Sequence, residues 1–120
     1  MANKKFVNLA VIPSDCKLWN QEKPDPNLEN IKKYVDESSF RRILKKCIEC
    51  GQLYFYEMLE FIDWEDGEDP MYRTYVPVAT EADADTLAAV TQVELCSHVP
   101  QIRYDWPKGV AKSKILWIKE

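Results

Sequence analysis

Apolar residues between Ser39 and Cys50 recur at the spacing of one face of an α-helix, and arginines and lysines fill most positions between them. The apolar positions are Phe40, Ile43, Leu44, Cys47 and Ile48. Gly51 follows, and glycine is the residue that most readily adopts the left-handed conformation that ends a helix. The pattern therefore predicts an amphipathic helix over this stretch, packed against a sheet.

An earlier helix is predicted to begin at Asp25 and Pro26, a capping residue followed by proline at the first helical position. Apolar residues continue at helical spacing as far as Val35. Because each residue turns a helix by roughly 100°, this apolar face and the one around Ile43 would lie nearly opposite each other on one straight helix. We therefore expect a break near residues 36–39, with a serine capping the second helix.

Strand-like stretches occupy much of the remaining chain. They cover residues 4–12, 53–64, 71–78, 102–106 and 115–118. A loop between the first strand and the first helix carries Leu18 and Trp19, which we expect to tuck into the core. Thr80 is expected to cap another helix, whereas Val90–Leu95 fits either a helix or a strand. The elements predict a single α+β domain over residues 1–120, with an antiparallel or mixed sheet of four to five strands and two to three helices packed mainly on one face.

The composition is that of a globular protein, with 46% hydrophobic and 30% charged residues. Apolar runs are short and the first residues lack a signal-peptide pattern, so neither a membrane helix nor secretion is predicted. We expect a protein of the cytosol, or of the cytosol of a host cell, whose four cysteines are reduced thiols. The net charge of -4 conceals eleven acidic residues and one basic residue between Glu57 and Ile102. Separate acidic and basic surfaces, or segments that neutralise each other, are both compatible with this distribution.

Two close pairs of side chains suggest zinc chemistry. The candidate ligands are Cys47, Cys50, Cys96 and His98. Tetrahedral zinc prefers thiolates and a neutral imidazole, so these residues could form a Cys3His site. Against this, Cys47 lies on the apolar face of the predicted helix, and the second pair is closer together than in the common zinc-binding motifs. Buried structural thiols are the alternative, and no other cofactor is predicted.

The turn between the strands 53–64 and 71–78 is dense in carboxylates around an Asp66-Gly67 tip. Its spacing does not match the calcium loop of an EF-hand. It is either a solvated tip that keeps an edge strand from pairing, or a contact with the basic surface of a partner protein, with Trp64 and Met71 as its apolar anchor. The candidate partner-binding residues are Tyr56, Trp64, Glu65, Asp66, Glu68, Asp69, Met71 and Tyr72.

Signals for catalysis are weak. Glu57 shares a predicted strand face with bulky apolar residues and could act as a catalytic acid, but such a glutamate more often meets solvent or an arginine. A single histidine and three glycines leave no nucleophile elbow or phosphate-binding loop. Lysines near Trp106 and Trp117 suit single-stranded nucleic acid, but the acidic net charge argues against that partner.

We therefore expect a non-enzymatic small acidic protein that binds a basic partner protein through the acidic turn. Small acidic inhibitors and immunity proteins act in this way, and the comparison is one of style alone. A zinc-stabilised protein is one alternative. The other is a small-molecule or nucleotide binder, or a hydrolase, with a pocket among Tyr54, Tyr56, Glu57 and Tyr104.

Overall fold

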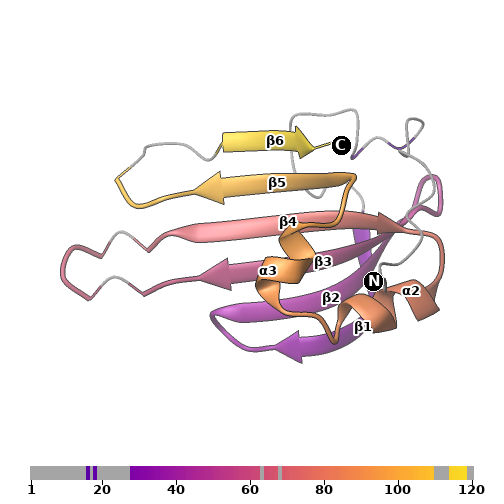
Figure 1. Cartoon of the computed structure of the whole chain (residues 1–120), viewed down its shortest axis with the longest axis horizontal. Coiled ribbons are helices and arrows are strands. Elements are labelled where there is room, and N and C mark those ends of the chain that lie inside the picture. Colours follow the sequence, from indigo (N-terminus) through magenta and orange to yellow (C-terminus); the bar gives the residue numbers. More distant parts are fainter. Residues whose placement is uncertain are drawn as a thin grey trace, which may run out of the picture.

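The fold is a six-stranded antiparallel sheet with two short helices (Figure 1), as seen in a computed structural model that describes residues 16, 18, 28–62, 64–67, 69–109 and 114–118. The strands follow the order of the chain across the sheet. They are β1 (Leu28–Asp36), β2 (Phe40–Cys47), β3 (Leu53–Glu60), β4 (Met71–Val78), β5 (Gln101–Trp106) and β6 (Lys114–Ile118). Helices α2 (Glu81–Leu87) and α3 (Gln92–Cys96) lie between β4 and β5. Within the described ranges, neither helix is long and apolar enough to span a membrane.

Both helices expected before Gly51 are strands, so the prediction of four to five strands with two to three helices is wrong. β2 pairs with β1 on one side and with β3 on the other. Neighbouring residues of a strand face opposite sides of the sheet, and both sides are covered here: Ile43 packs in one core cluster and Leu44 in the other. Adjacent apolar residues buried on opposite faces therefore imitate the spacing of a helical face.

The irregular pairing of β1 explains why residues 28–36 also resembled a helix. Its pairing with β2 shifts register at two places within residues 30–35. Such shifts interrupt the two-residue alternation of side chains, and Leu28 packs against one core cluster while Tyr34 packs against the other. The chain does change direction at the expected break near residues 36–39, but it does so between two strands.

The second half of the chain follows the expected elements closely. β4 spans the expected residues, and the Thr80 side chain caps α2 by accepting a hydrogen bond of 3.2 Å from the backbone N–H of Asp83. The ambiguous stretch Val90–Leu95 contains most of α3, which Thr91 opens in a reciprocal capping box with Glu94. β5 and β6 begin one residue before the expected strands. The strand expected over residues 4–12 lies outside the described residues.

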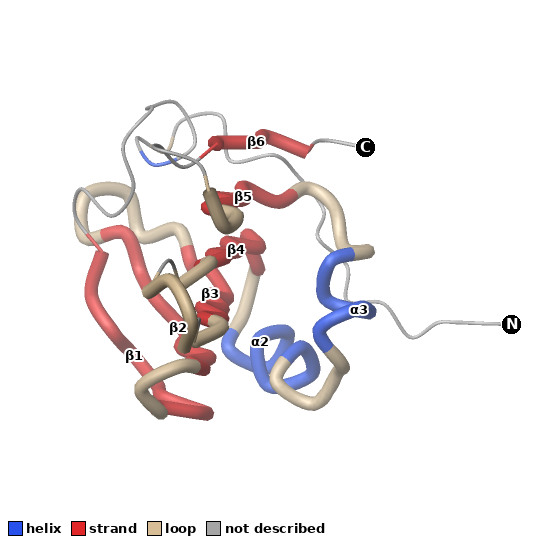
Figure 2. The backbone as a smooth tube through the Cα atoms, turned by 90° about the vertical axis from the view of Figure 1, so that its left-hand side faces the viewer, coloured by secondary structure: helices blue, strands red, loops and turns tan. Residues whose placement is uncertain are grey.

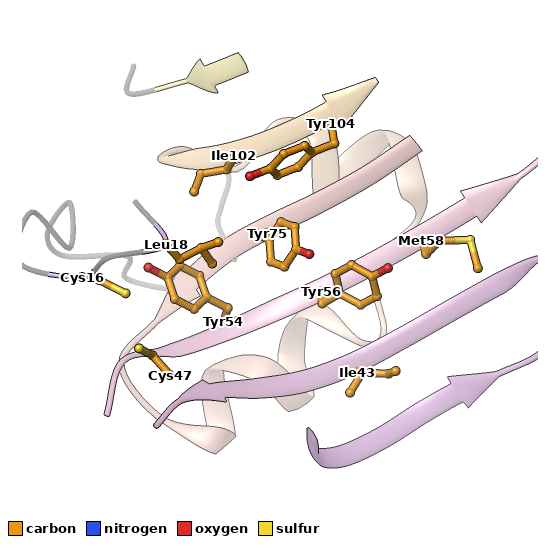
Figure 3. Close-up of a cluster of buried hydrophobic side chains, with 10 residues drawn as sticks. All are labelled: Cys16, Leu18, Ile43, Cys47, Tyr54, Tyr56, Met58, Tyr75, Ile102 and Tyr104. Carbon is orange, nitrogen blue, oxygen red and sulfur yellow. The ribbon is translucent and has the colours of Figure 1, made fainter. Parts of the chain in front are cut away.

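Two clusters of buried side chains cover the two faces of the sheet. One includes Leu44, Phe55, Val76, Ala84, Leu87 and Leu95, and so joins the strands to α2 and α3 (Figure 2). In the other, Tyr75 is central, with its ring centroid 5.0 Å from that of Tyr56 and 5.8 Å from that of Tyr104 (Figure 3). Leu18 is 0% exposed in this second cluster, which confirms its expected place in the core, whereas Trp19 lies outside the described residues.

Arg42 joins the sheet to the helical layer. Its side chain is 5% exposed, and its Nε and Nη2 atoms lie 2.9 and 2.8 Å from Oε2 of Glu57, which is 2% exposed. Its Nη1 donates to the backbone carbonyls of Val90 at 2.7 Å and of Ala88 at 3.2 Å, just beyond α2. One guanidinium therefore neutralises a buried carboxylate and satisfies carbonyls near the end of a helix.

Replacing Arg42 with methionine should lower the free energy of unfolding by about 3 to 5 kcal/mol, because the Glu57 carboxylate would remain buried without its counter-charge. Urea denaturation measures this loss. Arg41→Met is the matched control: the ion pair of Arg41 with Asp36 is exposed, so its loss should cost no more than about 1 kcal/mol. Equal losses in the two variants would contradict the role assigned to Arg42.

Asp85 holds α2 to the edge strand β1. Its Oδ1 accepts a hydrogen bond of 2.6 Å from the Tyr34 hydroxyl and one of 3.0 Å from Nζ of Lys32. These two hydrogen bonds, that of Tyr34 first, and the charge of Lys32 hold the pKa of Asp85 below its ordinary value. The folded state therefore favours the ionised carboxylate.

The stability that Asp85 contributes should be fully present above the ordinary pKa of 3.8 and lost as the pH falls through the lower pKa of the folded protein. Asp85→Asn should therefore show a smaller fall in melting temperature than the wild type between about pH 7 and about pH 3. Tyr34→Phe, which removes the largest cause of the shift, should change the acid response in the same direction. If both variants keep the pH dependence of the wild type, this coupling does not exist.

Candidate functional site

The connection between β3 and β4, residues 61–70, carries three large apolar side chains in solvent and is called the acidic hairpin below. Trp64 is 90% exposed, Phe61 52% and Ile62 43%. The backbone N–H of Phe61 donates to the carbonyl of Pro70 at 2.9 Å, and the Phe61 ring meets Tyr72 edge-on with centroids 6.1 Å apart. In Figure 1 the hairpin extends well beyond the turn that joins β1 and β2. Its base is therefore ordered, while its tip presents Trp64 to solvent.

Carboxylates surround this apolar tip. The acidic hairpin contains five acidic residues and no basic residue. Glu65, Asp66 and Asp69 are exposed, whereas Asp63 and Glu68 lie outside the described residues. Oδ2 of Asp66 lies 3.0 Å from Nζ of Lys108, in the turn after β5, and both side chains are about half exposed. Because the hairpin has five acidic residues and no basic residue, its own net charge is negative even with Lys108 beside Asp66.

The other predicted contact residues lie toward or below the base of the hairpin. Met71 and Tyr72 begin β4 and are half-buried. Tyr56 is only 7% exposed, and Nζ of Lys45 lies 4.3 Å from its ring centroid. Tyr56 therefore belongs to the core of the sheet and not to the exposed surface of the hairpin.

Three cysteines meet at the opposite end of β3, and they form the thiol cluster. The Sγ atoms of Cys16, Cys47 and Cys50 all lie within 4.8 Å of one another. Of the four predicted zinc ligands, the structure thus brings together Cys47 and Cys50, while Cys96 and His98 are not members of this group. All four cysteines of the chain are thiols in the structure.

Cys96 is the last residue of α3. The charged side chains that interact with its thiol are Arg103, Glu57 and Asp105. Burial is the main cause that raises the pKa of its thiol, and nearby Arg103 offsets part of this effect. His98 is 5% exposed, and burial lowers the pKa of its imidazole. Both groups are therefore held in their neutral forms near pH 7.

Cys16 was not among the predicted ligands, because it falls in a stretch expected to be a loop, far along the chain from Cys47. The available signal was Leu18, an apolar residue expected to enter the core. Leu18, Cys16 and Cys47 do pack in the same buried cluster (Figure 3). The expected burial of Leu18 could therefore have indicated that Cys16, two residues earlier, is buried as well.

The four residues that the sequence suggested as a pocket lie on different faces of the sheet, because side chains alternate along a strand. Tyr54, Tyr56 and Tyr104 belong to the cluster on one face of the sheet. Glu57 points to the other face, where it is paired with Arg42. The four side chains do not line one site, and Glu57 meets an arginine, which was the favoured interpretation of this glutamate.

The turn between β2 and β3 has the backbone geometry that holds Cys50 beside Cys47. The N–H of Cys47 donates to the carbonyl of Gln52 at 2.9 Å, and the N–H of Gly51 donates to the carbonyl of Cys47 at 2.8 Å. Gly51 adopts a φ of 83°, in the left-handed region that glycine occupies without a steric penalty. The glycine that predicted a helix end therefore closes a hairpin turn.

Comparisons of the chain with protein-family models, with curated proteins and with solved structures find no match. Function consequently has to be inferred from the geometry of two sites at opposite ends of β3. One is the acidic hairpin and the other is the thiol cluster.

Replacing Gly51 with alanine should lower the free energy of unfolding by about 1 kcal/mol, because an L-residue is strained at this φ. A Cβ at this position would meet no heavy atom within 4 Å, so the loss should come from the backbone and not from a clash. Asparagine tolerates the left-handed region, and Gly51→Asn should cost less than Gly51→Ala when both are measured by urea denaturation. The reverse order would contradict a conformational origin.

Proposed function

We propose that this protein acts by non-enzymatic binding to a partner protein with a basic surface, and that the acidic hairpin is the contact surface. The observation that carries the proposal is the exposure of Trp64, at 90%, beside exposed Phe61 and Ile62. The hairpin contains no serine, threonine, cysteine or histidine, so carboxylates are its only chemically active side chains. Recognition is therefore the function that its composition supports best.

The apolar side chains supply the attraction. Three large exposed apolar side chains within a four-residue segment are the kind of exposed apolar surface that marks binding sites. Tryptophan is among the residues that most often dominate the energy of a protein interface, because it buries a large area with few rotatable bonds. The contacts of Phe61 with Pro70 and Tyr72 order the base of the hairpin before any partner arrives, which reduces the entropy lost on binding.

The carboxylates select the partner. A negative tip attracts a positive surface, speeds its association at low salt and disfavours acidic partners. Glu65 and Asp69 are exposed on the two sides of the turn. An arginine- or lysine-rich protein surface with an apolar recess is therefore the complementary partner.

Affinity capture with the full chain, followed by measurement of Kd with the purified captured protein, tests this proposal. Trp64→Ser should raise Kd by at least about 30-fold, the effect expected when a residue that dominates an interface is removed. Reversing two charges, as Glu65→Lys with Asp69→Lys, should slow association and reduce its salt dependence.

Two matched variants act as controls. Val93 on α3 is 78% exposed, so Val93→Ser removes an exposed apolar side chain elsewhere and should leave Kd unchanged. Glu29→Lys with Glu49→Lys changes the net charge by the same amount at exposed positions at the end of the sheet away from the hairpin. If both control variants lost binding to the partner as completely as the hairpin variants do, the hairpin would not be the contact surface.

A further inference from the structure

The thiol cluster gathers sulfur atoms from two separate parts of the chain. Cys47 ends β2 and Cys50 lies in the turn that follows, whereas Cys16 comes from before β1. Cys16 and Cys47 are 1% and 2% exposed, and Cys50 is exposed at the edge of the group. Figure 3 shows Cys16 and Cys47 on the same side of the sheet as Leu18 and Tyr54. The cluster is therefore mostly enclosed and opens to solvent at one thiol.

The turn is arranged to support a negatively charged sulfur at Cys47. The backbone N–H groups of Cys50 and Glu49 donate hydrogen bonds to the Cys47 sulfur. Backbone N–H groups aimed at a thiolate are the kind of outer contact that orients and stabilises a metal ligand. Three thiolates within 4.8 Å of one another would repel each other, and a cation bound between the sulfurs would offset this repulsion.

Tyr54 lies against the same sulfurs. It is 0% exposed, and its hydroxyl oxygen is buried without a hydrogen-bond partner of ordinary geometry among the described residues. Cys16, Cys47 and Cys50 all lie close enough to interact with this hydroxyl. A buried hydroxyl that stays protonated beside three thiols is placed to donate a hydrogen bond to a thiolate.

We propose that Cys16, Cys47 and Cys50 bind a zinc ion as three thiolates. At a Zn–S distance of about 2.3 Å, tetrahedral geometry separates two sulfurs by about 3.8 Å, so thiols within 4.8 Å of one another need to approach by no more than about 1 Å. Zinc prefers thiolates, whereas magnesium and calcium prefer oxygen ligands and iron–sulfur clusters take four cysteines. Binding releases one proton from each thiol that is still protonated. Zinc takes a fourth ligand, for which the exposed edge at Cys50 leaves access to water.

The bound ion would fasten the segment of Cys16 to the β2–β3 turn. A cross-link of this kind restricts the unfolded chain and stabilises the folded one. This site is independent of the acidic hairpin, because the two lie at opposite ends of β3. Loss of zinc should therefore lower stability without preventing contact at the hairpin.

Native mass spectrometry of the full chain, purified without chelator and with a phosphine reductant, is the first test. One zinc ion per chain that disappears on denaturation is the expected result. A metal-free chain with the mass of four intact thiols would overturn the proposal. A chain that has lost two hydrogens to a disulfide between members of the cluster would overturn it as well.

Single substitutions then identify the ligands. Cys16→Ser and Cys50→Ser should each weaken zinc binding by more than the roughly 10- to 100-fold that loss of an outer-shell partner costs, as measured by competition with a chromophoric chelator. Cys50 is exposed, so Cys50→Ser should keep the circular dichroism spectrum of the wild type even if Cys16→Ser does not fold. Cys96→Ser is the control, because its thiol lies outside the cluster and zinc affinity should not change. Equal losses in Cys50→Ser and Cys96→Ser would overturn the assignment.

Cobalt(II) gives a readout that does not depend on stability. Added to the metal-free chain, cobalt should produce the intense thiolate charge-transfer absorption of a sulfur-ligated ion, in the wild type and in Cys96→Ser. This absorption should fall in Cys50→Ser, and Tyr54→Phe should weaken cobalt binding by roughly 10-fold because a thiolate loses its hydrogen-bond donor. A wild-type spectrum without thiolate charge transfer would contradict the site.

Discussion

The ion pair between Arg42 and Glu57 is the interaction on which the helix-facing side of the sheet depends. Glu57 lies on β3, where the register places Arg42 on one side and Thr74 on the other. A carboxylate that is 2% exposed in the middle of a sheet is costly unless a counter-charge stays beside it. The same guanidinium donates to Ala88 and Val90, so the pair also sets where the chain leaves α2. The apolar contacts of Leu87 and Leu95 with the sheet then form around this polar centre.

β3 is the common support of both candidate sites. It is buried on both faces from Tyr54 to Met58, because one core cluster lies on each side of the sheet. Such a strand is a rigid spacer, with the thiol turn before its first residue and the acidic hairpin after its last. The protein therefore separates a candidate metal-stabilised end from a candidate recognition end, and binding at either end would stabilise the same strand.

Local signals in the sequence identified much of the second half of the chain. The strands at residues 71–78 and 102–106 and the cap at Thr80 each depend on near neighbours, and each is present. The prediction of helices before Gly51 was wrong for a physical reason. Periodicity reports which residues are buried, but it does not report whether they are buried on one face of a helix or on two faces of a strand. Ile43 and Leu44 lie on different faces, and both are buried because a core cluster covers each face, the one around Leu44 being built from β3, β4, α2 and α3.

The candidate sites divide in the same way. The sequence by itself indicated a turn dense in carboxylates, because the strands on either side of it are adjacent in the chain, whereas the structure showed that β3 ends at Glu60 and that Trp64 is 90% exposed. The sequence also indicated that Cys47 and Cys50 stay together, since two residues separate them. Only the tertiary structure decided that Cys16 joins them while Cys96 and His98 do not. Contacts between distant segments depend on how the whole sheet is paired and covered, and no local pattern of residues encodes that arrangement.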